Sequence, residues 1–440
     1  TMNGFKGGDL MGVAERLDYL QDLGVDCLYF TPIFASASNH RYHTNDYYHV
    51  DPILGGDRAF QHLLTEAHRR NIRVVLDGVF NHTGRGFFQF NHIMECGPDS
   101  PYVDWFDIRG YPLNAYSSEP NYRCWINLPA LPEFNHKNPQ VVAFIQDVAR
   151  YWLDQGIDGW RLDVPFCFGD DEFWQAFRQV VKSCNPEAYI SGEIPNDATR
   201  WLKGDQFDGV MNYLFSYACW GFFGGKVFDK ATIGHWIFHC ADLLSYKAED
   251  FARQLSDLLV KYPLPNVLAQ MNQLDSHDTT RLLTIFGRDK RRVRLATLFQ
   301  MTYPGAPMVY YGNEIGLDGL GDPDCRKSFP WDERIWDHEL RRFFQKTIAL
   351  RKAHRCLRDG AFTMLHAVDE VCIYLRQHED ERAVVAFNLS TAALRLDLDV
   401  NGILPEGCVL SSQLGSGEAR VQNGRLDGLT LPPMSGSVLM

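Results

Sequence analysis

Short apolar runs alternate with longer amphipathic stretches from Leu10 to about Leu350. The runs predict strands at 27–31, 73–77, 159–163, 189–193, 209–212, 270–274 and 308–311. The stretches between them predict helices, among them 13–23, 59–70, 141–155 and 173–183. Regular alternation of strand and helix indicates βαβ units and a parallel sheet. Seven such strands are one fewer than the eight of a (β/α)8 TIM-type barrel, so we expect an α/β fold of this type.

Two segments depart from this alternation. Residues 82–138, after the strand at 73–77, are rich in Gly, Pro, Tyr, Asn and Phe and predict a small inserted subdomain. After about residue 360 short alternating strands such as 371–376 and 383–388 predict a C-terminal β-sandwich. We therefore expect a catalytic barrel at 1–81 and 139–356, an inserted subdomain at 82–138 and a sandwich domain at 357–440.

Composition excludes several classes of protein. A net charge of −12 over 440 residues argues against nucleic-acid binding. The longest apolar stretch, near 298–311, is broken by Pro304 and Pro307, so no membrane span is expected. Eleven cysteines without a C-x-x-C pair favour a reducing, cytoplasmic location. Aromatic residues make up 13% of the chain, a surplus that suits a cleft for ring-shaped ligands.

Four acidic residues lie at or just beyond the ends of predicted strands. Asp77 ends V-V-L-D, Asp163 ends G-W-R-L-D, Glu193 follows I-S-G, and Asp278 lies in Q-L-D-S-H-D. Parallel strands bring their carboxyl ends to one mouth of a barrel, and buried carboxylates are costly unless they are paired or functional. The pattern therefore predicts a catalytic cluster.

Arg161 stands two residues before Asp163, so both side chains share one face of the strand. We expect the guanidinium to hold Asp163 ionised, as a nucleophile requires; a purely structural ion pair is the alternative. His82 and His277 lie beside the acids and can donate to hydroxyl groups, and neither has the H-E-x-x-H spacing of a zinc site. Paired carboxyl groups among aromatic rings are the equipment of a glycosidase, and in the retaining version one carboxylate attacks while the other, protonated, delivers a proton.

These motifs are similar to those of a known family. D-G-V-F-N-H, G-W-R-L-D-V, G-E-I and S-H-D, in this order, resemble the signature regions of the α-amylase family (glycoside hydrolase family 13). K-G-G-D-L, N-H-R-Y-H-T-N-D-Y, P-G-A-P-M-V-Y-Y-G-N-E and D-P-D-C-R-K resemble its neopullulanase, cyclomaltodextrinase and maltogenic amylase branch. In that branch another barrel strand, similar to Y-Q-I-F-P-D-R-F, precedes the position of Thr1. It is absent from this sequence, so the insertion would follow barrel strand 3.

The resemblance implies a role for each candidate residue. Asp163 would be the nucleophile, Glu193 the general acid/base, and Asp278 the carboxylate that binds sugar hydroxyls and stabilises the transition state. The sugar in the cleaved subsite would be bound by Arg161, His82 and His277, supported by Asp77 and Asn81, and stacked on Tyr42. Asp322 and Arg326 would hold the next sugar.

The resemblance also implies the activity. We expect a retaining hydrolase of α-1,4 glucosidic bonds, with α-1,6 bonds as a further option, in maltodextrins, cyclodextrins, starch or pullulan. A transglycosylase or isomerase of the same family is the first alternative, and a non-catalytic carbohydrate-binding barrel is the second. No cofactor is expected. Some relatives bind calcium through the G-G-D segment, but here Asp9 alone offers too few oxygen ligands and is predicted to cap a helix instead. The oligomeric state stays open.

Overall fold

A computed structural model describes residues 6–228, 233, 245–415 and 417–440. The chain divides into two compact units, Thr1–Val210 and Met211–Met440, which are described separately below.

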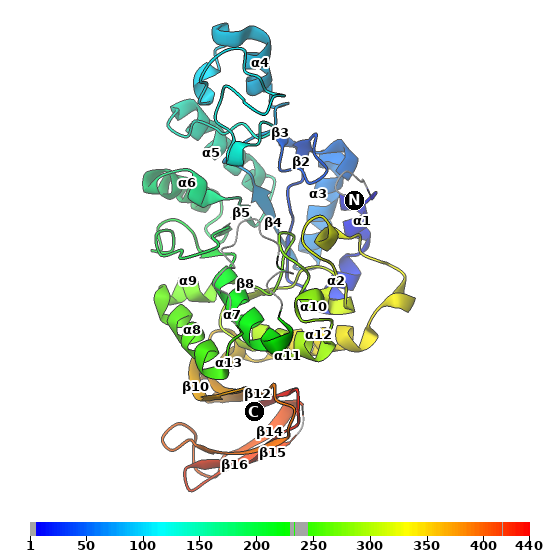
Figure 1. Cartoon of the computed structure of the whole chain (residues 1–440), viewed down its shortest axis with the longest axis vertical. Helices are drawn as coiled ribbons and strands as arrows, with labels where there is room; N and C mark the ends of the chain where they lie inside the picture. The colour runs from blue at the N-terminus through cyan, green and yellow to red at the C-terminus, as the bar shows by residue number, and fades with distance from the viewer. Residues whose placement is uncertain (1–5, 229–232, 234–244, 416) are drawn as a thin grey trace. The chain divides into compact units, whose positions relative to one another are not determined.

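The first unit is built on a five-stranded parallel sheet in the order β1-β4-β5-β6-β7, of which Figure 1 labels β4 and β5. Its register places Asp77 opposite Arg161 and Arg161 opposite Ser191. The chain therefore leaves the middle strands at the same edge, where Asp163 and Glu193 follow directly. The strands are β1 (Cys27–Tyr29), β4 (Arg73–Gly78), β5 (Gly159–Leu162), β6 (Tyr189–Gly192) and β7 (Gly209–Val210).

Helices follow the strands as the alternation predicted. They are α1 (Leu10–Glu15), α2 (Leu17–Leu23), α3 (Gly56–Arg69), α5 (Pro139–Asp154) and α6 (Asp171–Cys184), with the 3-10 turns η1 (Pro52–Leu54) and η5 (Pro165–Cys167). The single helix expected at 13–23 is wrong, because the backbone breaks at Arg16 (φ −107°, ψ 9°). Leu10 and Leu17 are buried seven residues apart, so the apolar period continues across the break and does not reveal it. Asp9 caps α1, as expected, by accepting a bond from the Gly12 amide.

Residues 82–138 form an ordered insertion around clustered rings. It contains α4 (Phe88–Cys96) and the 3-10 turns η2 (Gly97–Asp99), η3 (Val103–Trp105) and η4 (Trp125–Asn127). Phe90 packs against Phe106 and Tyr122 with ring centroids 5.0 and 4.9 Å apart, and all three are buried. Part of the aromatic surplus therefore forms the core of this insertion and does not line a cleft.

The antiparallel strands β2 (Phe34–Ser36) and β3 (Thr44–Val50) precede α3, and the turn between them carries Tyr42.

In the second unit β8 (Met271–Gln273) and β9 (Ala306–Met308) pair in parallel, and Met211 bridges to Met271. The strand expected at 308–311 therefore begins two residues earlier. Pro307 is tolerated inside it because the Ala306 amide donates to the Gln270 carbonyl, which turns the nitrogen of the next residue away from β8. The surrounding helices are α7 (Tyr213–Gly224), α8 (Ala248–Lys261), α9 (Leu264–Leu268), α10 (Leu282–Ile285), α11 (Lys290–Thr302), α12 (His338–Ala353) and α13 (Arg355–Arg358), with the 3-10 turns η6 (Gly225–Val227), η9 (Asn313–Ile315), η10 (Asp324–Arg326) and η11 (Glu333–Ile335).

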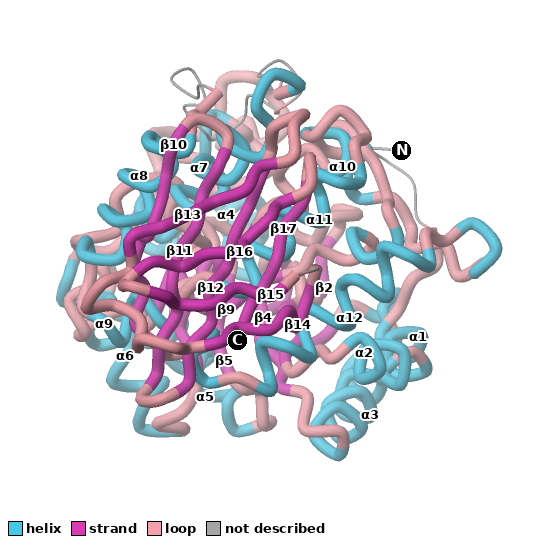
Figure 2. Tube along the Cα trace, turned by 90° about the horizontal axis from the view of Figure 1, so that it is seen from below, coloured by secondary structure: helices cyan, strands magenta, loops and turns pink. Residues whose placement is uncertain are grey.

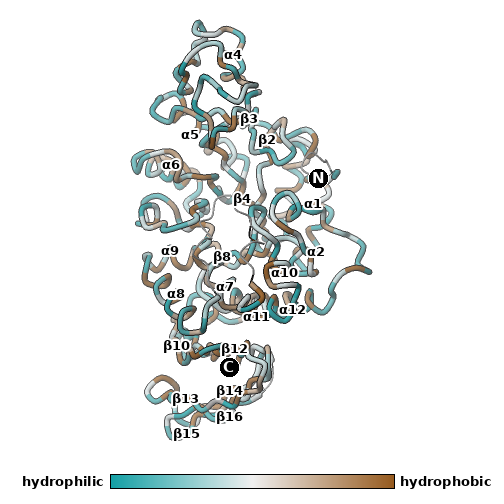
Figure 3. Tube along the Cα trace, in the orientation of Figure 1, coloured by the Kyte–Doolittle hydropathy of each residue, from teal (hydrophilic) through white to brown (hydrophobic). Residues whose placement is uncertain are grey.

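The second unit ends in an eight-stranded antiparallel sheet of order β10-β11-β12-β17-β14-β15-β16-β13, seen in Figure 2. Ile373 and Val384 near one end of that order share a core with Leu426 and Leu429 near the other, so the sheet folds over on itself. Hydrophilic and hydrophobic residues are mixed along these strands (Figure 3): buried and exposed residues alternate along β15, and along β16 except at the exposed pair Asp427 and Gly428. The strands are β10 (Ala361–Val368), β11 (Val371–His378), β12 (Glu381–Asn388), β13 (Leu394–Asp399), β14 (Val409–Leu414), β15 (Glu418–Gln422), β16 (Arg425–Leu431) and β17 (Ser435–Leu439).

Two buried arginines join this sheet to the helices of the same unit. Arg376 on β11 donates to the carbonyl of Thr302, at the end of α11, and to those of Leu357 and Gly360. Arg351 on α12 donates to the Met301 carbonyl, one residue earlier in α11. The last carbonyls of a helix have no partner within the helix and carry partial negative charge, so the two guanidinium groups satisfy them.

Replacing Arg376 with Met is expected to lower the free energy of unfolding by about 3 kcal/mol, because several buried carbonyls lose their donor. Urea unfolding measures this change. Arg395→Met is the control: its side chain is 71% exposed and pairs with Asp427, so a change within about 0.5 kcal/mol is expected. Equal effects of the two substitutions would contradict the role given to Arg376.

Among the described residues, no helix combines the length and hydrophobicity that crossing a membrane requires. The described cysteines are all free thiols.

Candidate active site

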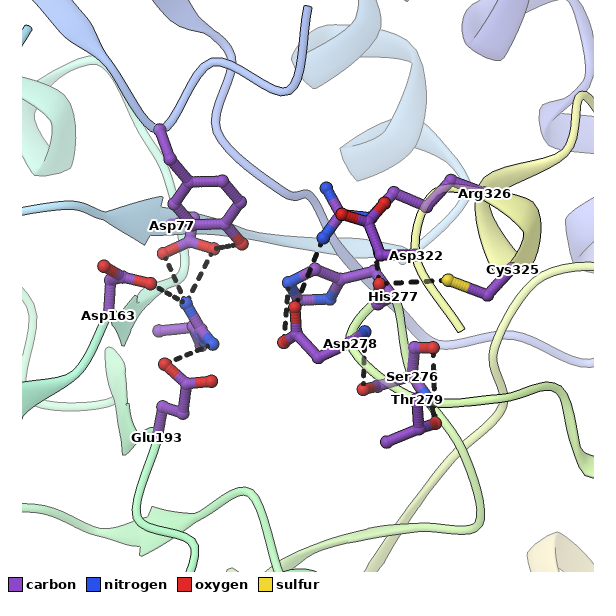
Figure 4. Close-up of polar contacts among 12 residues, drawn as sticks. Asp77, Asp163, Glu193, Ser276, His277, Asp278, Thr279, Asp322, Cys325 and Arg326 are labelled. Atoms are coloured by element: carbon purple, nitrogen blue, oxygen red, sulfur yellow. Dashed lines mark hydrogen bonds and ion pairs between the residues drawn. The ribbon is translucent and has the colours of Figure 1, made fainter. Parts of the chain in front are cut away.

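Three buried carboxyl groups surround one buried guanidinium in the first unit. Arg161 Nη1 lies 3.0 Å from Asp77 Oδ2 and 3.0 Å from Asp163 Oδ1, and Nη2 lies 2.9 Å from Glu193 Oε2. Figure 4 shows the carboxyl groups of Asp77, Asp163 and Glu193 turned toward this common centre. Parallel, in-register strands deliver all four side chains, so the predicted convergence of these residues at one sheet edge is found.

The charges of this cluster do not cancel. Three ionised carboxylates against one guanidinium would leave two negative charges in a buried site, which is costly. Burial raises the pKa of Asp77 to about 6, and burial together with the Glu193 charge raises the pKa of Asp163 well above its usual value. Arg161 pairs with Asp163, as expected, and favours its ionised form, but the same guanidinium is shared among three acids and cannot neutralise all of them. The protonation of each carboxyl group therefore depends on that of its neighbours.

Two tyrosine hydroxyls complete the surroundings of Asp77. Tyr29 and Tyr42 both donate to Asp77 Oδ2, at 2.9 and 3.1 Å. Sequence reasoning missed Tyr29, although its place at the end of β1 is the same strand-end signal that identified the acids. Tyr42 lies at the cluster, as expected, and its role as a stacking platform stays a prediction.

His82 presents a hydrogen-bond donor that the protein leaves unused. Its ring stacks on Trp125 with centroids 5.2 Å apart, and its Nδ1 lies 3.1 Å from the Asn81 amide nitrogen. With that amide as donor, Nδ1 accepts and Nε2 carries the hydrogen. Nε2 is buried and has no hydrogen-bond partner in the protein. Burial lowers the pKa of His82 to about 3, so the ring is neutral, and Nε2–H is suited to a ligand oxygen.

The residue after Asp163 has an unusual backbone. Val164 has φ 39° and ψ 47°, a left-handed conformation that is costly for a β-branched residue. This conformation accompanies a hydrogen bond from the Val164 amide to Glu193 Oε2 at 3.1 Å. The strained turn therefore ties the carboxyl group of Glu193 to the residue that follows Asp163.

A second polar group lies after β8 in the second unit. Asp278 Oδ2 lies 3.1 Å from His277 Nε2, and Asp278 Oδ1 lies 3.3 Å from Arg326 Nη2. Arg326 also pairs with Asp322 at 3.1 Å and donates to the His277 carbonyl at 2.9 Å. Figure 4 shows the side chains of His277, Asp322 and Arg326 beside Asp278. All four were predicted as site residues, and the structure brings them together within this unit.

Sequence reasoning missed the residues that hold this loop in place. Asp275 is buried and accepts from the Leu282 amide at 2.8 Å and from Asn313 Nδ2 at 2.5 Å. Arg281 is buried too, and donates to the carbonyls of Tyr311 and Cys325. The string Q-L-D-S-H-D contains two acids, and only the tertiary contacts show that the first is a support and the second is more accessible.

Asp9, the residue considered for calcium, accepts the Gly12 amide at 2.7 Å. The described part of the chain holds no group of three or more His, Cys, Asp or Glu side chains placed to bind a metal ion.

Comparison with known proteins gives consistent matches along the chain. Residues 1–355 match the family model of the α-amylase catalytic domain, and residues 362–439 match the neopullulanase-like C-terminal domain. The chain is 42% identical to neopullulanase 2 of Thermoactinomyces vulgaris over 99% of this chain and 71% of that protein. It is 43% identical to a cyclomaltodextrinase of a Bacillus species over 88% of this chain and 67% of that protein.

A solved structure gives the same result. The debranching enzyme of Nostoc punctiforme superposes with a TM-score of 0.93 at 45% identity, covering 99% of this chain and 90% of the other. The predicted fold class, a parallel βα catalytic domain followed by an antiparallel sheet domain, is confirmed, and so is the predicted family of enzymes. This chain belongs to the α-amylase family of glycoside hydrolases.

Proposed function

We propose that this chain is a retaining hydrolase of α-glucans that cleaves α-1,4 and α-1,6 glucosidic bonds. The observation that carries the proposal is the group of three buried carboxyls around Arg161. A retaining glycosidase needs one carboxylate to attack and one carboxylic acid to protonate the leaving group, both beside the same bond. Asp163 and Glu193 share one guanidinium and supply such a pair.

In the first step Asp163 attacks the anomeric carbon and Glu193 protonates the glycosidic oxygen. This breaks the bond to the leaving sugar and forms a covalent glycosyl-enzyme. In the second step Glu193 takes a proton from water, and the oxygen of that water displaces Asp163 with restoration of the α configuration. Arg161 stabilises whichever carboxyl group is ionised at each stage, and Asp77 with its two tyrosine donors holds the guanidinium in place.

Further side chains are proposed to bind sugar hydroxyl groups. His82 would donate from Nε2 to a hydroxyl group. Asp278, held by His277 and Arg326, would accept hydrogen bonds from hydroxyl groups and stabilise the positive charge that develops on the sugar ring. Asp322, through its pair with Arg326, would hold the next sugar.

The breadth of substrates is proposed from the named relatives. Neopullulanase 2, cyclomaltodextrinase and the debranching enzyme are named for acting on different α-glucans or linkages. We therefore propose maltodextrins, cyclodextrins, starch and pullulan as substrates. Water is the acceptor in the second step, and no cofactor is part of the proposal. The free thiols of the described cysteines support a reducing, cytoplasmic location.

Incubation with maltotriose, β-cyclodextrin, starch and pullulan tests the proposal directly. Chromatography identifies the products, and proton NMR during the first turnovers identifies their anomer. We expect α-configured reducing ends from at least one α-1,4-linked substrate, and activity unchanged after dialysis against EDTA. A β-configured first product would contradict the retaining mechanism, and no product from any of the four would contradict the proposed function.

Replacing His82 with Phe is expected to lower kcat/KM by about 10- to 100-fold, because the ring can still pack on Trp125 while the donor is lost. The melting temperature should not fall, since the lost N–H has no partner in the protein. The loss should be equal at pH 5 and pH 8, because the wild-type ring is neutral at both. His92→Phe, on α4, is the control and should leave kcat/KM unchanged. A loss of kcat/KM that differs between pH 5 and pH 8 would contradict the assignment of His82 as a neutral hydrogen-bond donor.

A further inference from the structure

Two neighbouring aromatic rings, one half-buried and one exposed, lie on the loop that follows Arg326. Phe329 and Trp331 have ring centroids 4.3 Å apart, and Trp331 is 42% exposed. We refer to these two rings as the aromatic patch. Ile335, four residues further on, is 66% exposed. Adjacent large apolar side chains at a surface mark binding sites more often than scattered single ones do.

The aromatic patch packs against a third, buried aromatic ring. Trp336 is buried, with its ring 5.7 Å from Phe329 and 6.4 Å from Trp331. The Trp336 indole nitrogen donates to the Pro330 carbonyl at 2.5 Å, and Asp332 caps η11 by accepting the Arg334 amide. Because the rings are already held in place, a ligand that stacks on them loses little side-chain entropy on binding.

A chain of contacts connects the aromatic patch to Asp278 within the same unit. Arg326 pairs with Asp278 and begins the loop. The next residue, Lys327, accepts a hydrogen bond on its carbonyl from the hydroxyl of Tyr311, which is itself 39% exposed. Two residues further on the chain reaches Phe329. A linear ligand with one end at Asp278 could therefore continue past Arg326 and Tyr311 to the patch.

We propose that the aromatic patch is a distal sugar-binding subsite, which stacks on a glucose unit of a longer α-glucan whose reacting end lies at Asp278. This rests on the proposed function. The C–H faces of pyranose rings pack on aromatic rings, and sugar hydroxyls hydrogen-bond to charged groups. Such groups flank the patch: Lys327 pairs with Asp318 at 3.1 Å, and Asp332 pairs with Arg334 at 2.7 Å. Cores of protein–protein interfaces are depleted of charged residues, so a sugar fits this surface better than a second protein does.

The test compares substrates of different length. Trp331→Ala is expected to lower kcat/KM for maltohexaose by about tenfold and to leave kcat/KM for maltotriose within about twofold, because only the longer chain reaches the patch. Trp331→Phe keeps a flat ring and should restore most of the activity on maltohexaose. Val260→Ala, which shortens an 83% exposed apolar side chain on α8, is the matched control and should leave both values unchanged.

Binding is measured separately in the Glu193→Gln background, where the substrate is not consumed. Calorimetry should show weaker maltohexaose binding after Trp331→Ala and unchanged maltotriose binding. Equal effects on both sugars, or no effect on either, would overturn the proposal while hydrolysis of maltotriose still supports the proposed function. A change in sedimentation behaviour without any dependence on substrate length would also overturn it and identify the patch as a self-association surface. Failure of the wild-type chain to hydrolyse maltohexaose, while it hydrolyses another of the proposed substrates, would overturn this proposal alone; failure on every proposed substrate would overturn both proposals.

Discussion

Removal of Asp163 and removal of Glu193 are expected to abolish normal turnover and to give opposite anomers with azide. Asp163→Ala should lower kcat/KM on maltotriose by about 10,000-fold, because the covalent step is lost. Glu193→Ala should lower it by about 100- to 10,000-fold, and much less on α-maltosyl fluoride, whose fluoride leaves without protonation. Both variants are assayed with the fluoride as donor and sodium azide as added nucleophile.

The stereochemistry follows from the face that azide attacks. In Asp163→Ala the azide occupies the space of the lost carboxylate and displaces fluoride directly, so the product is β-maltosyl azide. In Glu193→Ala the glycosyl-enzyme still forms on Asp163, and azide displaces that ester with a second inversion to give α-maltosyl azide. Proton NMR of the two azides distinguishes the roles.

Asp208→Asn is the control for loss of a partly buried carboxylate in the same unit. Asp208 pairs with Arg178 and Lys182, away from the Arg161 cluster. Asp208→Asn should change the rate by no more than a few-fold, and added azide should have the same effect on it as on the wild-type chain. Exchange of the two azide anomers would reverse the assigned roles. More than a tenth of wild-type activity in either alanine variant would show that the pair is not catalytic.

Loss of the Arg161 charge is expected to destabilise the protein and to make its stability strongly pH-dependent. Arg161→Met leaves three buried carboxyls without their cation, which should cost about 3–5 kcal/mol at neutral pH. The pKa values of Asp77 and Asp163, already raised by burial, should rise further because Arg161 is the partner that lowers them.

The direction of the pH dependence follows from proton linkage. An unfolded Asp or Glu releases its proton near pH 4, whereas the folded variant keeps it to a higher pH. The unfolded state therefore binds fewer protons between those values, and stability falls as pH rises through the folded pKa. Urea unfolding should show a larger loss at pH 8 than at pH 5, and the acid limb of the kcat/KM profile should move to higher pH.

The double variant Arg161→Met, Asp77→Asn provides the control. It removes one of the three carboxylates, so it should recover part of the stability at pH 8 and little at pH 5. An equal loss of stability at both pH values would contradict the electrostatic account. It would indicate that Arg161 contributes through packing alone.

Much of the site could be predicted from local patterns. Asp77, Asp163 and Glu193 each end or follow a short apolar run, and strands in parallel register bring such ends to one edge. The burial of Arg161 with Asp163 follows from their spacing of two on one strand. The supports Tyr29, Asp275 and Arg281 could not be identified in this way, because each is defined by a partner distant in sequence.

The sequence by itself determined the order of strands and helices, the family motifs and the positions of the acids, because hydrophobic period and strand-end position are properties of neighbouring residues. Only the tertiary structure decided the break at Arg16 and the earlier start of β9, since both depend on backbone hydrogen bonds. It also decided that one guanidinium serves three carboxyl groups and that the pKa of Asp163 is raised. Burial and shared charge depend on which side chains meet in space, and spacing along the chain does not contain that information.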